Sequence, residues 1–294
     1  MPWNETTPPT GIVASDEFRY AVPAVPPPAL ETRDISYHVD GLEILHRVSI
    51  IVPRGQIVAI VGPNGAGKTT LFELISCQSR PTSGSIRISG EEATGLRPAE
   101  VASRGVGRLF QEVRVFAHLS VLENVLAALR KPAGESVLGA IFDWRWRRQR
   151  ADAVDVAWDH LRTVGLEQEA GRWAAQLSFG QQKLLGFAAL LASKAELLLL
   201  DEPTAGLAPA AIERVLGLIN RLVQDAGRTI LLIEHDLDSV TKLCDRAYVL
   251  EKGRILTEGV ATTVVSDLRA RAERFETLVE VQPDLPPAEE PCSR

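Results

Sequence analysis

A glycine-rich stretch directly after a short apolar run limits the folds open to this chain more than any other feature. Residues 57–61 read Ile-Val-Ala-Ile-Val, the pattern of a buried strand, and residues 71–75 carry apolar side chains at helical spacing. Between them, residues 62–70 match the pattern G-x-x-x-x-G-K-[ST]. Glycines let such a loop turn tightly and point its amide hydrogens at an anion. This order of strand, loop and helix predicts a phosphate site in an α/β core.

The side chains of the loop indicate that the anion is a nucleoside triphosphate. Lys68 is expected to reach the β- and γ-phosphates, and Thr69 to offer its hydroxyl to Mg²⁺. The positive end of the helix dipole adds to the attraction. An ordinary glycine-rich turn is the alternative, and the strand and helix on either side argue against it. The expected phosphate-binding residues are Gly62, Pro63, Asn64, Gly65, Ala66, Gly67, Lys68, Thr69 and Thr70.

Composition narrows the classes of protein that remain. The formal net charge of -6 argues against a broad nucleic-acid-binding surface, so no nucleic acid partner is expected. Three scattered cysteines among 294 residues suit a reducing cytosol rather than a disulfide or zinc framework. No stretch reaches the roughly 20 apolar residues of a membrane span, and the N-terminus lacks a secretion-signal pattern. We therefore expect a cytoplasmic protein, which would be peripheral if it works at a membrane.

Prolines and periodicity predict the domain boundaries. Seven of the 18 prolines lie in residues 1–29 and four in residues 283–294, so both ends are expected to be extended or disordered tails. Docking of a proline-rich end on a partner is the alternative. Between the tails we expect a folded part that starts near residue 30, with an antiparallel sheet at its start and a helical subdomain over about 112–180. A C-terminal helix and a proline-rich acidic tail are expected over 266–294.

Two later strand patterns end in side chains that suit nucleotide hydrolysis. The four leucines of 197–200 precede Asp201 and Glu202, and the run 229–233 is followed two positions later by His235. Ligands of parallel sheets bind beyond the carboxyl ends of the strands. We expect Asp201 to hold Mg²⁺, Glu202 to activate the attacking water and His235 to contact the γ-phosphate. Taken singly, helix capping by the acidic pair and a plain surface histidine are the alternatives.

The stretch Leu177-Ser178-Phe179-Gly180-Gln181 resembles the signature motif of ATP-binding-cassette (ABC) ATPases, which usually reads Leu-Ser-Gly-Gly-Gln. It stands at the end of the helical insert and shortly before the Asp201 strand, as in that family. Gln111 matches the glutamine of the family's Q-loop. Tyr37 stands where the family carries an aromatic residue that stacks on adenine, and burial in the core is its alternative role. The segments 201–207 and 234–236 are similar to the family's Walker B, D-loop and switch-histidine regions.

This resemblance covers about residues 30–265 and implies that they form an ABC ATPase domain. It also implies a fold, a reaction and a second subunit. The fold is the α/β P-loop NTPase fold of ABC ATPases, with an antiparallel β subdomain and an inserted helical subdomain, and the ligands are ATP and Mg²⁺. Gln111 is implied as a Mg²⁺ contact and a sensor of the γ-phosphate. Ser178, Gly180 and Gln181 are implied to contact ATP held by the other subunit of a head-to-tail dimer. A single subunit should therefore hydrolyse ATP slowly, because its transition state lacks half of its donors.

Finer matches resemble one branch of the family. Residues 107–125 and 177–185, with Phe179 at the third signature position, look like the ATPases of branched-chain amino-acid importers, within them the member with the longer helical insert. This implies a second ATPase subunit, homologous or identical, a transmembrane permease, and indirectly a substrate-binding protein. The implied place is the inner face of the cell membrane. A lipid or drug exporter subunit and a soluble ABC ATPase are the alternatives.

Two features add separate expectations. Ala208 stands where many relatives have Asp or Asn in the D-loop, which predicts weaker coupling between the two nucleotide sites. Residues 138–150 combine aromatic side chains with four arginines. We expect this segment to contact the permease or anionic lipid headgroups, with packing of an amphipathic helix on its own subdomain as the alternative.

Overall fold

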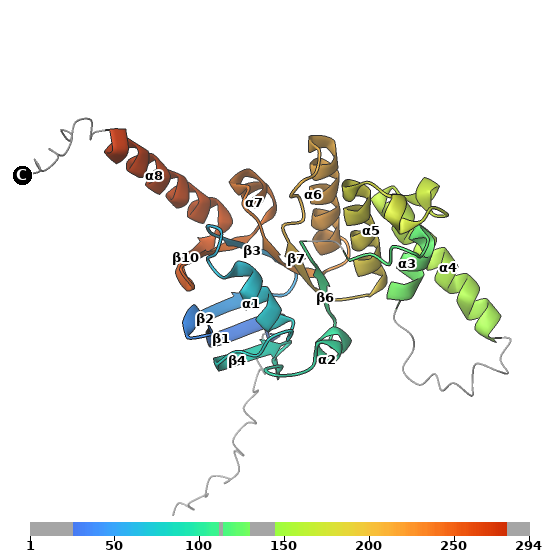
Figure 1. Ribbon diagram of the computed structural model, residues 1–294, viewed down its shortest axis with the longest axis horizontal. Helices are drawn as coiled ribbons and strands as arrows, with labels where there is room; N and C mark the ends of the chain where they lie inside the picture. Colours follow the sequence, from blue (N-terminus) through green and yellow to red (C-terminus); the bar gives the residue numbers. More distant parts are fainter. Residues whose placement is uncertain (1–25, 112–113, 130–144, 281–294) are drawn as a thin grey trace, which may run out of the picture.

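A six-stranded sheet forms the centre of the computed structural model, which describes residues 26–111, 114–129 and 145–280 (Figure 1). Its strand order is β10-β9-β3-β8-β7-β6, and all neighbouring pairs except β9 and β10 are parallel. The parallel strands therefore bring their carboxyl ends to one edge. The strands are β3 (Ile57–Val61), β6 (Val106–Leu109), β7 (Leu197–Asp201), β8 (Thr229–Ile233), β9 (Arg246–Glu251) and β10 (Arg254–Val260).

The second sheet is antiparallel and has the order β2-β1-β4-β5. Its strands are β1 (Leu30–Val39), β2 (Leu42–Val52), β4 (Ser83–Ile88) and β5 (Glu91–Glu92). The antiparallel sheet expected at the start of the domain is thus present. The short β-type runs at 44–45 and 48–52 belong to one strand, β2, in which Arg47 has a positive φ of 47° and the register with β1 shifts. This irregularity breaks the alternation of side chains and explains why the two halves look separate in the sequence.

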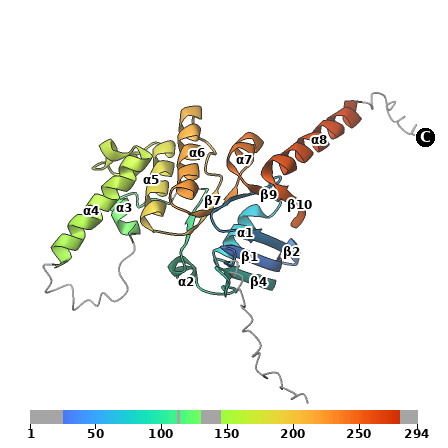
Figure 2. The same ribbon diagram turned by 180° about the vertical axis from the view of Figure 1, so that it is seen from behind.

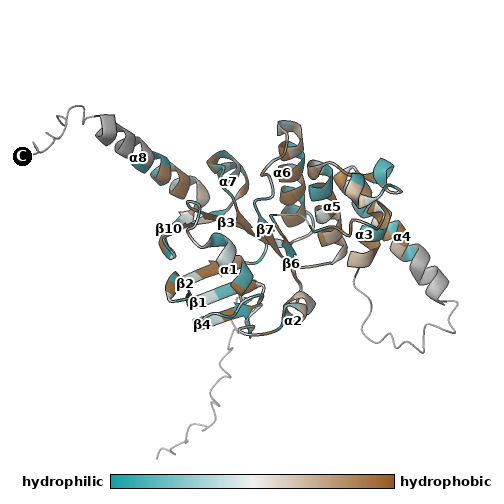
Figure 3. Cartoon of the chain, in the orientation of Figure 1, coloured by the Kyte–Doolittle hydropathy of each residue, from teal (hydrophilic) through white to brown (hydrophobic). Residues whose placement is uncertain are grey.

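Both faces of the central sheet are buried, because side chains alternate along each strand. On β3, Val58 and Ile60 join the core that contains helix α1 and the antiparallel sheet, while Ile57 and Ala59 join the core beneath α5, α6 and α7. Figure 3 shows hydrophobic residues concentrated along these central strands. Strands buried on both faces read as continuous apolar runs, which is why the pattern at 57–61 is so plain.

The helices complete the layers and the insert. Those between β6 and β7 make up the helical subdomain, at the opposite end of the molecule from α8 (Figures 1 and 2). The helices are α1 (Lys68–Ile75), α2 (Pro98–Ser103), α3 (Val121–Ala128), α4 (Arg145–Val164), α5 (Phe179–Ala192), α6 (Pro209–Gln224), α7 (Leu237–Leu243) and α8 (Ala261–Glu280), with short 3₁₀ turns at Glu167–Glu169 and Ala174–Gln176.

The chain ends and the arginine-rich segment fall partly outside the described residues. The tails 1–25 and 281–294 lie outside them, as do residues 138–144 of the segment expected to face the membrane. Of residues 145–150 the structure describes the helical backbone of α4. The C-terminal helix α8 begins at Ala261, five residues before the expected boundary at 266. Within the described ranges, none of the helices combines the length and the apolar character that crossing a bilayer requires.

Candidate functional site

The phosphate loop connects β3 to α1 at the carboxyl edge of the central sheet. Gly62 has φ 154°, and a Cβ atom at this position would lie 2.0 Å from the carbonyl oxygen of Leu250. Gly67, with φ 100°, is the N-cap of α1, and its Cβ would lie 2.6 Å from Cδ2 of Leu45. Only glycine fits both positions, so the loop is held against β9 and β2 while its open side faces solvent. Asn64, Gly65 and Thr69 are exposed on that side.

Lys68 is folded back onto the loop. Its Nζ donates to the carbonyl oxygens of Gly62 and Pro63, each at 2.8 Å. Burial lowers the pKa of Lys68, and the carboxylates of Asp201 and Glu202 act against this shift. The ammonium group therefore stands at the mouth of the loop, at hydrogen-bonding distance from two carbonyls and close to two carboxylates. A bound phosphate would compete for the same donor.

Asp201 is buried at the end of β7, with 1% of its surface exposed. Its Oδ2 lies 3.4 Å from Nη2 of Arg108, while its Oδ1 is buried and has no hydrogen-bond partner. Burial raises the pKa of Asp201, and Arg108 opposes that rise. A buried oxygen without a partner costs free energy, which a cation would recover. Together with the hydroxyl of Thr69 and the amide oxygen of Gln111, this oxygen offers the ligand type that Mg²⁺ prefers, so these residues fit the ion.

Glu202 is where three of the predicted residues meet. Its Oε2 accepts a hydrogen bond from Nε2 of Gln111 at 2.9 Å, and its Oε1 lies 2.6 Å from Nε2 of His235. The carboxylate is 16% exposed and thus reachable by water. The three side chains follow β7, β6 and β8, which are adjacent in the sheet. This geometry is suited to a general base held by two polar neighbours.

Glu202 also has an uncommon backbone conformation. Its φ is 47°, in the left-handed region that non-glycine residues seldom adopt. Its amide donates to the carbonyl oxygen of Ile233 at 3.1 Å, and its carbonyl oxygen accepts from Nζ of Lys183 at 2.7 Å. Such strain persists where surrounding contacts hold it, and it gathers at functional sites.

Two buried cations near this centre were not predicted. Arg108 contacts Asp201, donates to Oγ of Ser76 at 3.1 Å and lies over the ring of Phe110, 4.6 Å from its centroid. Lys183 is 0% exposed and binds two backbone carbonyls. In the sequence each is a single charge within an apolar strand or helix. That pattern is a usable signal, because a buried charge requires a partner.

The signature residues lie at the start of α5, which is separated from α1 in Figures 1 and 2. Ser178 is the N-cap: its Oγ accepts from the amide of Gln181 at 3.3 Å, and its own amide donates to Oε1 of Gln181 at 3.0 Å. Gly180 is the second residue of α5. Ala208 is the N-cap residue of α6, and its side chain makes no capping hydrogen bond. The chain's own phosphate loop and signature residues are not brought together.

Tyr37 lies on β1, directly opposite Leu45 of β2. Its ring is half-buried and packs against the core that contains α1. Leu45 in turn packs against Gly67 of the phosphate loop. Tyr37 is therefore one side chain removed from the loop, a position that leaves both adenine stacking and core packing open.

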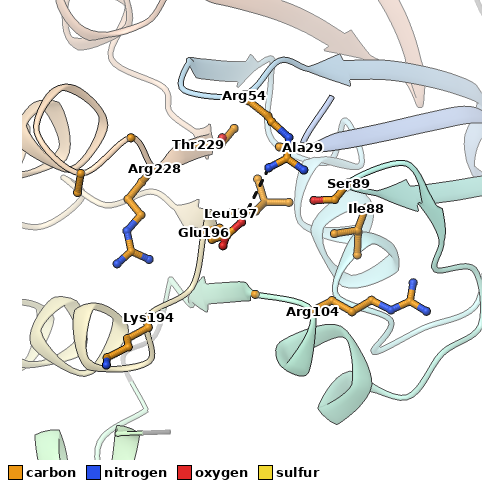
Figure 4. Close-up of a pocket in the computed structure, with 13 residues that line it drawn as sticks. Ala29, Arg54, Ile88, Ser89, Arg104, Lys194, Glu196, Leu197, Arg228 and Thr229 are labelled. Carbon is orange, nitrogen blue, oxygen red and sulfur yellow. Dashed lines mark ion pairs between the residues drawn. The ribbon is translucent and has the colours of Figure 1, made fainter. Parts of the chain in front are cut away.

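A cavity of about 390 Å³ lies at the other edge of the sheet, beside the amino ends of β7 and β8 (Figure 4). None of the predicted site residues lines it. Figure 4 shows the charged groups of Arg104, Lys194 and Arg228 spread around the cavity, and Arg54 pairs with Glu196 at 3.8 Å. These groups do not converge on a common point, so the cavity does not compete with the carboxyl edge as the functional site.

Comparison with known proteins agrees with the geometry. The family model described as ABC transporter matches residues 45–205. The branched-chain amino-acid transport ATP-binding protein BraF of Pseudomonas aeruginosa is 36% identical over 233 residues, which are 79% of this chain and 91% of BraF. LivG of Escherichia coli is 35% identical over 233 residues, which again are 79% of this chain and 91% of the relative. The methionine import ATP-binding protein MetN 1 of Burkholderia pseudomallei is 33% identical over 88% of this chain and 73% of its own.

Solved structures give the same result. A nucleotide-free ATP-binding cassette from an ABC transporter superposes with a TM-score of 0.72 at 30% identity, covering 85% of this chain and 98% of that one. The dimeric post-hydrolysis state of the cassette MJ0796 with ADP and Pi superposes with a TM-score of 0.68 at 25% identity, covering 79% and 98%. The expected α/β P-loop fold with its antiparallel and helical subdomains is thus confirmed, and the chain belongs to the ABC transporter family as an ATP-binding cassette.

Proposed function

We propose that this chain is the ATP-hydrolysing subunit of an importer for branched-chain amino acids or related small amino acids and amides. The convergence of Gln111 and His235 on the carboxylate of Glu202 carries the proposal of hydrolysis. The importer assignment rests on BraF and LivG, which share 35–36% of residues with most of this chain. MetN 1, a methionine import protein, is also similar, so methionine belongs among the substrates to be tested.

The chemistry follows from the positions of the side chains. Lys68, released from the carbonyls of Gly62 and Pro63, would bind the β- and γ-phosphates. Glu202 would take the proton of the attacking water, and His235 would hold the γ-phosphate beside it. Thr69, Asp201 and Gln111 would hold Mg²⁺, which supplies charge neutralisation on the phosphates when bound.

A second ATPase subunit would complete the site. Ser178 and Gln181 cap α5 in their own chain, and α5 stands apart from the chain's own phosphate loop, so its N-terminus is free to face the nucleotide of a partner. A helix N-terminus attracts phosphate through its amides and dipole. The partner would be a second copy or a homologous ATPase, arranged head to tail.

The permease would dock near the Gln111 loop. A cavity of about 570 Å³ opens between α2, β6 and α5, and small residues such as Ala99, Gly186 and Ala189 line much of it, beside Phe110. A short helix of a permease would fit such a surface and would lie one residue from Gln111. The chain would then be peripheral on the inner face of the cell membrane, with a substrate-binding protein acting on the permease's other side.

Reconstitution tests the proposal directly. The chain would be co-purified with candidate permease subunits and placed in proteoliposomes with a substrate-binding protein. We expect ATP-dependent uptake of leucine, isoleucine or valine, and no uptake with Glu202→Gln. ATP hydrolysis without uptake of any amino acid or amide would contradict import, and efflux of lipid or drug would support the exporter alternative.

A further inference from the structure

Lys183 is a fully buried cation that binds only backbone oxygens. Lys183 is 0% exposed and lies on the second turn of α5, a helix whose other core-facing residues are apolar. Its Nζ donates to the carbonyl oxygens of Glu202 and Ala205, at 2.7 and 2.8 Å. Among the residues that the structure describes, no carboxylate oxygen lies within 4.0 Å of this nitrogen. Because a buried charge is costly, a lysine held this way points to a specific use of its donors.

The start of α5 lies directly on the loop that follows β7. The ring centroid of Phe179 is 5.6 Å from Nζ of Lys183, and a Cβ atom at Gly206 would lie 3.0 Å from Cε1 of Phe179. One residue on, a Cβ at Gly180 would lie 3.4 Å from Cδ2 of Leu207. The N-terminal turns of α5 and residues 202–207 are therefore packed as a unit.

This unit has a functional residue at each end. At one end Ser178 caps α5, the helix end proposed to face a partner's nucleotide. At the other end the backbone of Glu202 has left-handed dihedral angles. Its amide donates to the carbonyl oxygen of Ile233, and its own carbonyl oxygen accepts from Nζ of Lys183. Hydrogen bonds on both sides of the residue fix the direction in which its carboxylate points. A movement of α5 would act on Glu202 through the Lys183 ammonium group.

We propose that Lys183 is a positioning residue that couples the signature end of α5 to Glu202, so that docking on the partner's nucleotide sets the general base in the chain's own site. This inference rests on the proposed function, since it requires ATP hydrolysis by a head-to-tail dimer. Lys183 touches neither nucleotide and acts through the backbone of residues 202–205.

Substitution of the ammonium group separates positioning from nucleotide binding. Lys183→Met keeps the length of the stem but leaves two carbonyls without a donor, whereas Lys183→Arg keeps donors. We expect Lys183→Met to lower kcat by about 10- to 100-fold, as for a misplaced catalytic group. The Kd of the ATP analogue mant-ATP should stay within about twofold, because Lys68 and the phosphate loop are unchanged. The Hill coefficient of hydrolysis against ATP concentration should fall toward 1, and Lys183→Arg should restore most of both values.

Lys194→Met is the matched control, because this exposed lysine lies just beyond the end of α5 and contacts neither Glu202 nor Ala205. It should match wild type in every measurement. If Lys183→Met does not fold by circular dichroism, Phe179→Ala takes its place, since that ring is 51% exposed and its loss spares the core. It should lower the Hill coefficient in the same direction.

The outcomes distinguish the two proposals. Wild-type kcat and cooperativity in Lys183→Met, or in Phe179→Ala where Lys183→Met is unfolded, would overturn the role of Lys183 and leave the ATPase assignment intact. A loss that appears in Kd and not in kcat would also overturn it. A wild-type chain that binds mant-ATP yet hydrolyses no ATP, alone or with its permease, would overturn the proposed function and this inference with it.

Discussion

Replacement of Glu202 by glutamine tests the centre of the site with the smallest change in shape. The side-chain amide introduced by Glu202→Gln would keep an oxygen to accept from Gln111 and place its NH₂ group toward Nε2 of His235, so both contacts of the carboxylate can be conserved. What disappears is the capacity to take a proton from water. We therefore expect ATP to bind normally and hydrolysis to fail.

The size of the loss follows from what remains in the site. A positioned general base contributes about 10²- to 10⁴-fold, which corresponds to roughly 2.7–5.4 kcal/mol of transition-state free energy. No spare base is at hand among the neighbouring carboxylates of the described residues. Asp201 is paired with Arg108, and Glu234 is buried and accepts from Thr204 at 2.7 Å. The expected decrease in kcat is thus about 10³-fold or more, in the upper part of that range.

The assay measures phosphate release at saturating ATP and Mg²⁺, and size-exclusion chromatography in the same buffer reports the dimer. Glu202→Gln should elute as an ATP-bound dimer while wild type returns to the monomer as ATP is consumed. Glu213→Gln, at an exposed position on α6, is the matched control and should hydrolyse ATP at the wild-type rate. A kcat of Glu202→Gln within about tenfold of wild type would refute the assignment of the base.

Three further changes probe the loop and the electrostatics. Lys68→Ala should abolish mant-ATP binding or turnover, because it removes the donor at the loop's mouth; a calorimetric titration checks this. Gly62→Ala should lower the free energy of unfolding by about 1–3 kcal/mol, seen as a lower Tm, because its Cβ would meet the backbone oxygen of Leu250. Burial raises the pKa of Glu234 above its ordinary 4.5. The folded chain therefore binds this proton more tightly than the unfolded chain does. As a result, the free energy of unfolding falls as the pH rises through the raised pKa. Glu234→Gln keeps an acceptor for Thr204, so its Tm relative to wild type should increase as the pH rises from the ordinary carboxyl pKa through the raised one, and a difference that does not change with pH would contradict this.

The parts of the fold that sequence predicts well are those in which one local rule decides the outcome. Residues 57–61 are buried on both faces, so an apolar run was sufficient to identify β3. The loop at 62–70 needs glycine at Gly62 and Gly67 for contact reasons that hold in any chain with this motif. The continuity of β2 was less visible, because Arg47 shifts the register in the middle of the strand. Its two halves are joined because both pair with the neighbouring strand β1, on either side of the register shift.

The candidate site divides in the same way. Glu202 and His235 could be placed from the strands that they follow, and Gln111 from the resemblance to the Q-loop of ABC ATPases. The three side chains do meet in space. Arg108 and Lys183 could not be placed, since their partners are 93 and 19 residues away and one of them binds only backbone. Side chains that perform chemistry carry recognisable motifs, whereas side chains that hold them in place are defined by the packing.

The two residues that hold the carboxylates in place, Arg108 and Lys183, would also determine how partner binding affects the proposed catalytic centre. Arg108 connects Asp201 to the Gln111 loop through Phe110, and Lys183 connects Glu202 to α5. The two buried cations thus connect the two carboxylates proposed for Mg²⁺ binding and hydrolysis to the two elements proposed to contact partners. Both contacts lie in low-dielectric surroundings, where a shift of about 1 Å changes an electrostatic energy more than it would in water. A permease at the Gln111 loop and a second ATPase at α5 would therefore reach the same catalytic centre by separate routes. Loss of the Arg108 contact should impair the response to the permease, and loss of the Lys183 contact should impair the response to the second nucleotide.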